Sequence, residues 1–258
     1  MPLGCCPLCT EEVKELQESH YISAGVYRIA GRDCHPVVMT PEIFLSTSKQ
    51  LKDYLLCSDC EQLLSKKGED YVIPLLWRGG NNFPLQDLLK STKPLGFGRN
   101  GSLVFSGPIV GIETDKLAYF ALSMFWKASV HSWKTLNGQV VSSSLRSHEE
   151  AVRKFLSGES GFPSGILIKV SVCSDPLSQG VVFPPHEWTN EIYTGYEMTL
   201  LGVCFTMVVD VKPGAIDWEL CCVNSSDRII FFEDCSETSR NHYQDLRKNA
   251  RIAKNLKM

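Results

Sequence analysis

Apolar residues are densest over residues 113–136, a stretch that contains neither Gly nor Pro. Large side chains recur there every three or four positions, which is the period of an α-helix. They form two stripes, so the helix has more than one apolar face and belongs in the interior of the protein. We therefore predict a buried helix over this range. The stripes contain Leu117, Phe120, Met124 and Ala128, and Trp126, Val130 and Trp133.

A second helix is predicted over residues 147–156. Ser147 suits the N-cap, because its hydroxyl can accept a hydrogen bond from a backbone N–H of the first turn. Glu149 and Glu150 follow where the helix dipole favours negative charge. Gly158 comes after the last turn, where glycine is a typical stop signal.

Beyond Pro163 the pattern changes to short runs that are rich in β-branched and aromatic residues. Pro, Gly, Asn or Asp separates the runs, as expected for strands joined by turns. The pattern predicts a small antiparallel sheet. The predicted strands cover residues 166–172, 180–183, 196–211, 218–223 and 229–232.

These elements divide the chain into four parts and predict an α+β fold. Residues 1–70 contain paired cysteines and many acidic residues, and form a first unit. Residues 71–112 are rich in Gly and Pro, which interrupt long regular elements, so we predict a connector with short elements. Residues 113–235 form a larger α+β domain that contains the buried helix and the antiparallel sheet. Residues 236–258 form a basic C-terminal helix or tail.

The composition is that of a folded globular chain. Of the 258 residues, 43% are hydrophobic and 21% are charged. The longest apolar runs, residues 117–126 and 198–209, are shorter than the ~20 residues of a membrane-spanning helix, so we predict no membrane segment. The first residues have neither the basic start nor the apolar core of a secretory signal. We therefore expect a cytoplasmic protein.

Charge is distributed unevenly along the chain. The formal net charge is -3, yet residues 1–70 alone carry seven Lys/Arg against eleven Asp/Glu. Residues 236–258 carry six Lys/Arg against two Asp/Glu. An acidic N-terminal region does not attract phosphate, so any contact with DNA or RNA would depend on local basic residues or on the C-terminal run.

Two Cys-x-x-Cys pairs are the strongest chemical signal in the sequence. Cys6 and Cys9 form the first pair, and Cys57 and Cys60 form the second. The chain has eleven cysteines, an odd number, and several stand alone in apolar strands, so a disulfide scaffold is not expected. Four thiolates in two such pairs suit tetrahedral zinc, and we predict one structural Zn²⁺ at these residues. Alternative ligands are Cys5, Cys34 and His35.

The first quarter of the chain resembles the zinc-supported, treble-clef version of the HNH nuclease (ββα-metal) fold, as in bacterial or phage-type proteins. The matching motifs are Cys-Pro-Leu-Cys at residues 6–9, Ser-His-Tyr-Ile at 19–22, and Leu-Leu-Cys-Ser-Asp-Cys-Glu at 55–61. In that family a β-hairpin begins with an acidic residue and a histidine. The histidine is the general base that activates water for attack on a phosphodiester. The resemblance gives this role to His20.

The chain departs from the family pattern at the expected metal ligands. Ser19 stands where the family usually has Asp or Glu, and Glu61 stands where it usually has Asn or His. Residues 49–54 contain no obvious counterpart of the asparagine that orients the histidine. Glu61 is the residue best suited to a hard cation, so a catalytic Mg²⁺ or Mn²⁺ would depend on it, on substrate phosphate and on water.

Two functions are compatible with this resemblance. The first is a metal-dependent endonuclease with His20 and Glu61 in its catalytic site. The second is a non-catalytic module in which the same zinc fold binds nucleic acid or a protein partner. An active site would require His20 and Glu61 to converge on one open cleft with a basic rim. Candidates for that rim are Lys14, Arg28, Arg32 and Lys52.

Other catalytic motifs are not evident in the sequence. There is no glycine-rich phosphate loop and no Gly-x-Ser-x-Gly nucleophile elbow. Four further histidines have no motif partners, and we expect each to be a surface or packing residue. They are His131, His148, His186 and His242.

Overall fold

The computed structural model describes residues 1–30, 37–39, 44–46, 50–98, 101–134, 140–180, 182–215 and 217–235. The basic run predicted for residues 236–258 lies outside the described residues, as do Arg32, Cys34 and His35. The architecture is mixed α+β, which confirms the predicted class. Within the described ranges, no helix is both long enough and apolar enough to cross a membrane.

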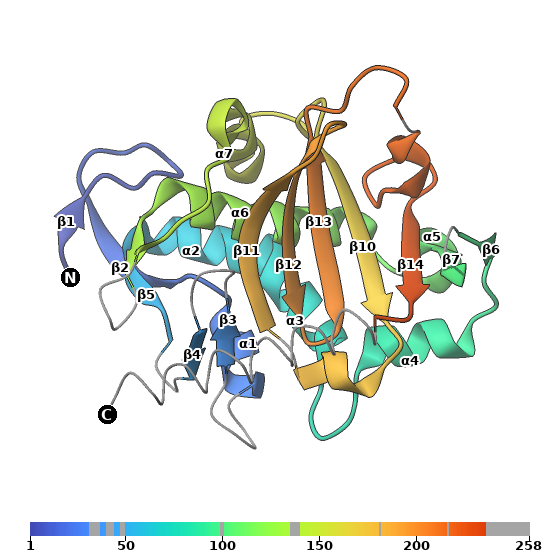
Figure 1. Ribbon diagram of the computed structural model, residues 1–258. Helices are drawn as coiled ribbons and strands as arrows, with labels where there is room; N and C mark the ends of the chain where they lie inside the picture. Colours follow the sequence, from blue (N-terminus) through green and yellow to red (C-terminus); the bar gives the residue numbers. More distant parts are fainter. Residues whose placement is uncertain are drawn as a thin grey trace, which may run out of the picture.

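A seven-stranded sheet dominates the larger part of the chain (Figure 1). Its strand order is β11-β12-β13-β10-β14-β7-β6, and β10 and β14 are parallel while the other neighbours are antiparallel. The sheet is therefore mixed and larger than predicted, because β6 and β7 come from the stretch interpreted as a connector. The strands are β6 (Gly96–Phe97), β7 (Leu103–Ser106), β10 (Leu167–Cys173), β11 (Val182–Thr189), β12 (Thr194–Leu200), β13 (Val203–Val209) and β14 (Ile229–Glu233).

Two of the predicted strands take another form. The run over residues 196–211 is split into β12 and β13, which pair through a tight turn at Leu201 and Gly202. The φ angles of these two residues, 53° and 83°, lie in the left-handed region, where glycine has no steric cost. The run over residues 218–223 is not a strand, because a 3₁₀ turn, η5 (Trp218–Cys221), occupies most of it.

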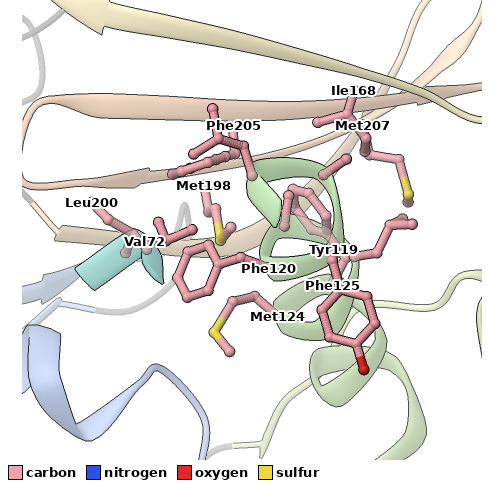
Figure 2. Packing of buried hydrophobic residues seen from close by; sticks show 14 of the residues in the cluster. Val72, Tyr119, Phe120, Met124, Phe125, Ile168, Met198, Leu200, Phe205 and Met207 are labelled. Carbon is pink, nitrogen blue, oxygen red and sulfur yellow. The ribbon is translucent and has the colours of Figure 1, made fainter. Parts of the chain in front are cut away.

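The predicted central helix is α6 (Thr114–Val130), which packs against the inner face of the sheet. Phe120 is fully buried, and its ring lies edge-on to that of Phe205 in β13, with 5.6 Å between ring centroids. Figure 2 shows both residues in one cluster that also contains Met198 and Met207. Side chains all around α6 are buried, which confirms a helix in the interior.

The end of α6 differs from the prediction. The helix stops at Val130 instead of residue 136, and the chain continues in extended form into β8 (Trp133–Lys134), which pairs with β9 (Val140–Val141). The indole N–H of Trp133 donates to the carbonyl of Lys127 at 2.9 Å. One of the last carbonyls of the helix is thereby satisfied, so Trp133 closes the helix instead of extending it.

The helix predicted at residues 147–156 is confirmed as α7 (Glu149–Ser157), which follows a 3₁₀ turn, η3 (Arg146–His148). The predicted N-cap is wrong, because Ser147 lies within this turn and the N-cap residue is His148. Gly158 ends it in the left-handed conformation, with a φ of 86°. The other helical segments are α1 (Ala24–Ala30), α2 (Ser58–Leu64), the π-helical η1 (Ser65–Glu69), α3 (Asp70–Leu76), α4 (Pro84–Ser91), α5 (Gly107–Val110) and the 3₁₀ turn η4 (Pro176–Gly180).

A second, three-stranded antiparallel sheet forms the N-terminal part, in the order β1-β2-β5. Between β2 and β5 the chain forms α1 and a hairpin of two short strands, β3 and β4. β5 leads directly into α2, and one continuous hydrophobic core joins this part to the larger sheet. The strands are β1 (Leu3–Gly4), β2 (Lys14–His20), β3 (Val37–Met39), β4 (Phe44–Ser46) and β5 (Lys52–Cys57).

A buried glycine marks the place where the N-terminal helices meet α6. α2, η1 and α3 form one helical run, and Gly68 lies in its π-helical segment. A Cβ atom at Gly68 would lie 3.1 Å from the Cα atom of Phe120 and 3.3 Å from its Cβ atom. Most side chains would be too large for this spacing. The missing side chain therefore allows the two helices to approach closely.

Gly68→Val should therefore destabilise the protein. The branched side chain would meet the backbone of α6, and overpacking of this kind costs about 1–3 kcal/mol. For a chain of this size the melting temperature should fall by about 2–4 °C for each kcal/mol, as followed by circular dichroism. Gly161→Val is the control, because a Cβ atom there has no neighbour within 4 Å. Equal melting temperatures for the two variants would contradict the close approach at Gly68.

One disulfide joins Cys173 and Cys235, whose Cα atoms are 5.4 Å apart. Cys173 lies at the end of an apolar strand, as the sequence predicted, but its pairing with Cys235 was not expected. β10 and β14 run in parallel with Cys173 opposite Glu233, so the chain brings Cys235 back to the end of β10. The pairing depends on two strands that are distant in the sequence, and the cysteine spacing gives no sign of it.

Candidate metal centre

The four predicted cysteines lie together at one end of the N-terminal sheet. Cys6 and Cys9 lie in the connection between β1 and β2, Cys57 is the last residue of β5, and Cys60 lies in the first turn of α2. Their Sγ atoms all lie within 4.8 Å of one another. The antiparallel pairing of β2 with β5 places Leu16 opposite Cys57, and this register brings the two distant pairs to one point.

The spacing of the four sulfur atoms fits a tetrahedral zinc ion. With Zn–S bonds of about 2.3 Å, the sulfur atoms of a zinc site are about 3.8 Å apart. The Sγ atoms of Cys9 and Cys57 are 4.0 Å apart. Cys6, Cys57 and Cys60 are buried, so an ion there would be shielded from water. The cluster could therefore hold a metal ion such as zinc.

The ionisation of these thiols also favours a cation. A hydrogen bond from Cys60 lowers the pKa of Cys6 to about 4. The same hydrogen bond, together with burial, raises the pKa of Cys60 well above its ordinary value, and burial raises that of Cys9. The pKa values of Cys6 and Cys60 thus shift in opposite directions because the two thiols share one hydrogen bond. A divalent metal favours thiolate at every position, because only thiolates bind it well.

Several backbone N–H groups support the sulfur of Cys6. The N–H of Cys57 lies 3.4 Å from the Cys6 Sγ atom, and the N–H groups of Leu8 and Cys9 also point to it. Cys5, an alternative ligand in the sequence, is exposed and is not a member of the cluster. The other two alternatives, Cys34 and His35, lie outside the described residues.

The second predicted site, His20 and Glu61, lies beside this cluster. His20 is the last residue of β2, and Glu61 follows Cys60 in the first turn of α2. The hydroxyl of the fully buried Ser19 donates to Oε1 of Glu61 and accepts the backbone N–H of Leu56 at 3.2 Å. Ser19 therefore fixes the Glu61 carboxylate next to the end of β2.

The surroundings of His20 favour a neutral imidazole. Burial and the nearby ammonium group of Lys127 lower the pKa of His20 below its ordinary value of 6.5. A hydrogen bond with the side chain of Gln50 and the charge of Glu61 act in the opposite direction. Glu61 is thus close enough to act electrostatically on His20, although the two are not in the same hydrogen bond.

Gln50 is a residue that the sequence reasoning missed. No counterpart of an orienting amide was recognised over residues 49–54, yet Gln50 lies in this stretch and its side chain bonds His20. The reason is the register of β2 with β5, in which His20 is opposite Lys52, so that residues just before β5 lie beside the imidazole. The side chain of Gln50 is an amide like that of asparagine, and this similarity could have identified it in the sequence as the residue that orients His20.

A buried ion pair next to His20 was also missed. The side chain of Lys127 in α6 is only 2% exposed, and its ammonium nitrogen lies 3.4 Å from Oε1 of Glu69. Oε2 of Glu69 accepts a hydrogen bond from the hydroxyl of Ser23 at 2.8 Å. The signal in the sequence was a single lysine within the apolar stretch of the central helix, which needs a charged partner when it is buried.

The basic rim proposed for phosphate is largely neutralised. Lys14 lies 3.0 Å from a carboxylate oxygen of Glu11, and Lys52 lies 2.5 Å from one of Glu18. Arg28 is exposed in α1, and Arg32 lies outside the described residues. The cations nearest to β2 and β5 therefore already have carboxylate partners.

The three other histidines among the described residues are not part of the cysteine cluster. His131 bonds Asp53 and His148 bonds Asp210, each at 3.0 Å, whereas His186 lies 3.3 Å from the carbonyl oxygen of Pro184. His242 lies outside the described residues. A cavity of about 690 Å³ opens beside His148, and neither His20 nor Glu61 lines it. The cavity is thus separate from the predicted site.

The chain matches no protein-family model, no curated protein and no solved structure.

Proposed function

We propose that the N-terminal part is a zinc-supported site of the ββα-metal type, with a treble-clef arrangement, that hydrolyses phosphodiesters of DNA or RNA. The observation that carries this proposal is the setting of His20. It ends a β-strand beside the cysteine cluster, its imidazole is bonded by Gln50, and the first turn of the next helix supplies the carboxylate of Glu61. The zinc is structural in this proposal.

The residues of the site have distinct roles. The oxygen of the Gln50 amide accepts one ring N–H of His20 and leaves the other ring nitrogen free to take a proton from water. Because burial lowers the pKa of His20, the imidazole is in this neutral form at physiological pH. Glu61 is the residue that would hold Mg²⁺ or Mn²⁺, which supplies charge neutralisation at the substrate phosphate.

A non-catalytic recognition module is the second candidate. The HNH family usually has metal ligands at the positions of both Ser19 and Glu61. Here Ser19 instead donates a hydrogen bond to one oxygen of the Glu61 carboxylate, which favours the non-catalytic module. The pairing of Lys14 with Glu11 and of Lys52 with Glu18 also reduces attraction for phosphate. In this form the zinc fold would bind nucleic acid or a protein partner without cleaving it.

The assay that separates the two functions measures cleavage of labelled DNA and RNA, single- and double-stranded, with Mg²⁺, Mn²⁺ or Ni²⁺. His20→Ala should lower the cleavage rate by about 100-fold or more, because loss of a general base has this effect. Zinc content and melting temperature should change little. The rate of the parent should fall on acidification only below pH 6.5, because protonation of His20 removes the base and its pKa lies below that value.

His186→Ala is the matched control, because His186 is half-buried on β11 and, among the described residues, bonds a backbone carbonyl. It should cleave like the parent and so exclude a contaminating nuclease. If the parent cleaves none of the substrates, the nuclease proposal fails and the recognition module takes its place. If His20→Ala unfolds the N-terminal part, His20 is structural.

A further inference from the structure

Arg153 connects the larger domain to the cysteine cluster. It lies in α7, and its side chain is 10% exposed. One of its N–H groups, on Nη1, donates to the carbonyl oxygen of Leu8 at 2.8 Å, across 145 positions of the sequence. Leu8 is fully buried and lies between Cys6 and Cys9. A residue of α7 therefore contacts the backbone inside the first Cys-x-x-Cys pair.

The guanidinium group is held firmly in place. Glu150 accepts from Nε at 2.8 Å and from Nη2 at 3.0 Å. Glu159 accepts from Nη1 at 2.7 Å and from Nη2 at 2.9 Å. Two forked carboxylate contacts leave the planar group little freedom to rotate. The donor to Leu8 is therefore fixed in direction as well as in distance.

The peptide that Arg153 contacts also contacts the metal centre. The Leu8 carbonyl and the Cys9 N–H belong to one planar peptide unit, and no peptide bond in the described chain is cis. In a trans unit the two groups point in opposite directions. The carbonyl faces Arg153, while the Cys9 N–H is directed to the Cys6 sulfur. Fixing one side of the plane therefore fixes the hydrogen bond on the other side.

We infer that Arg153 is a positioning residue of the metal centre, which acts through the Leu8–Cys9 peptide to hold an N–H group on the Cys6 sulfur. The hydrogen bond stabilises negative charge on a thiolate ligand, and groups that orient metal ligands contribute to metal affinity. The inference concerns metal binding alone, and it holds whether or not His20 is catalytic.

The test measures zinc affinity of the full chain by competition with the chromophoric chelator 4-(2-pyridylazo)resorcinol. Arg153→Gln and Arg153→Lys should each weaken zinc binding by about 10–100-fold, the usual range for groups that orient metal ligands. Lysine keeps the charge but lacks the fork that fixes the donor. Lys154→Gln is the matched control, because Lys154 is the next residue of α7, also pairs with Glu150, and should leave the affinity within twofold.

A spectroscopic reading distinguishes positioning from simple packing. With Co²⁺ in place of zinc, the sulfur-to-metal charge-transfer band of Arg153→Lys should shift to longer wavelength, since a thiolate that loses a hydrogen bond gives up an electron more easily. If Arg153→Gln does not fold, Arg153→Lys decides the question. A folded variant with unchanged zinc affinity and an unchanged Co²⁺ spectrum would overturn the inference, as would a parent protein that binds no zinc.

Discussion

Replacement of Cys57 and Cys60 together by serine should reduce the zinc content from one ion per chain to nearly none and lower the stability of the whole protein. Binding of structural zinc to small domains contributes about 10–16 kcal/mol. Even a loss of about 4 kcal/mol would lower the melting temperature by about 8–16 °C in a chain of this size. Mass spectrometry for metal and calorimetry for melting are the measurements.

The effect should be large because the cysteines hold the two halves of the N-terminal part together. Cys6 and Cys9 follow β1, whereas Cys57 and Cys60 join β5 to α2, so without an ion their thiol groups crowd at one point. Cys5→Ser is the control, since Cys5 is exposed and should leave both zinc and melting unchanged. The assignment of a metal centre would be wrong if the parent protein contains no zinc or if the double variant melts at the same temperature as the parent.

Phe120→Ala should cost about 3–5 kcal/mol in the free energy of unfolding, the range for a large aromatic side chain removed from a core. Phe120 is fully buried and its ring contacts that of Phe205 across the interface between α6 and the sheet. Close packing on both sides leaves little scope for the surroundings to collapse into the cavity. Urea denaturation, with a linear extrapolation to water, measures the loss.

Phe97→Ala provides the comparison, because Phe97 on the short edge strand β6 is 80% exposed. Its truncation should change stability by no more than about 0.5 kcal/mol. A Phe120 variant that loses less than about 1 kcal/mol would mean that α6 is not packed against β13 as described.

Local patterns in the sequence predict much of the fold. The apolar stripes identify α6, and the acidic first turn with Gly158 identifies α7. What they do not predict are pairings between distant segments. The parallel contact of β10 with β14, the disulfide that follows from it, and the addition of β6 and β7 to the sheet depend on long-range register. Such register is set by the whole core, not by neighbouring residues.

The candidate site shows the same division. Two Cys-x-x-Cys pairs were sufficient to predict the cysteine cluster, because the spacing itself reflects the geometry of a metal. Gln50, Lys127 and Arg153 were missed because each acts on a residue far from it in the sequence. The roles of His20 and Glu61 stay predictions until cleavage has been measured.

The burial of α6 on nearly all sides affects how the protein unfolds. Gly68 of the N-terminal helices and Phe205 of the large sheet both lie against Phe120 of this helix. Neither layer can separate without exposing the apolar surface that it shares with the other, and this exposure opposes partial opening. Unfolding should therefore be cooperative across both sheets. The backbone amides of α6 should then exchange with solvent only when the whole molecule opens.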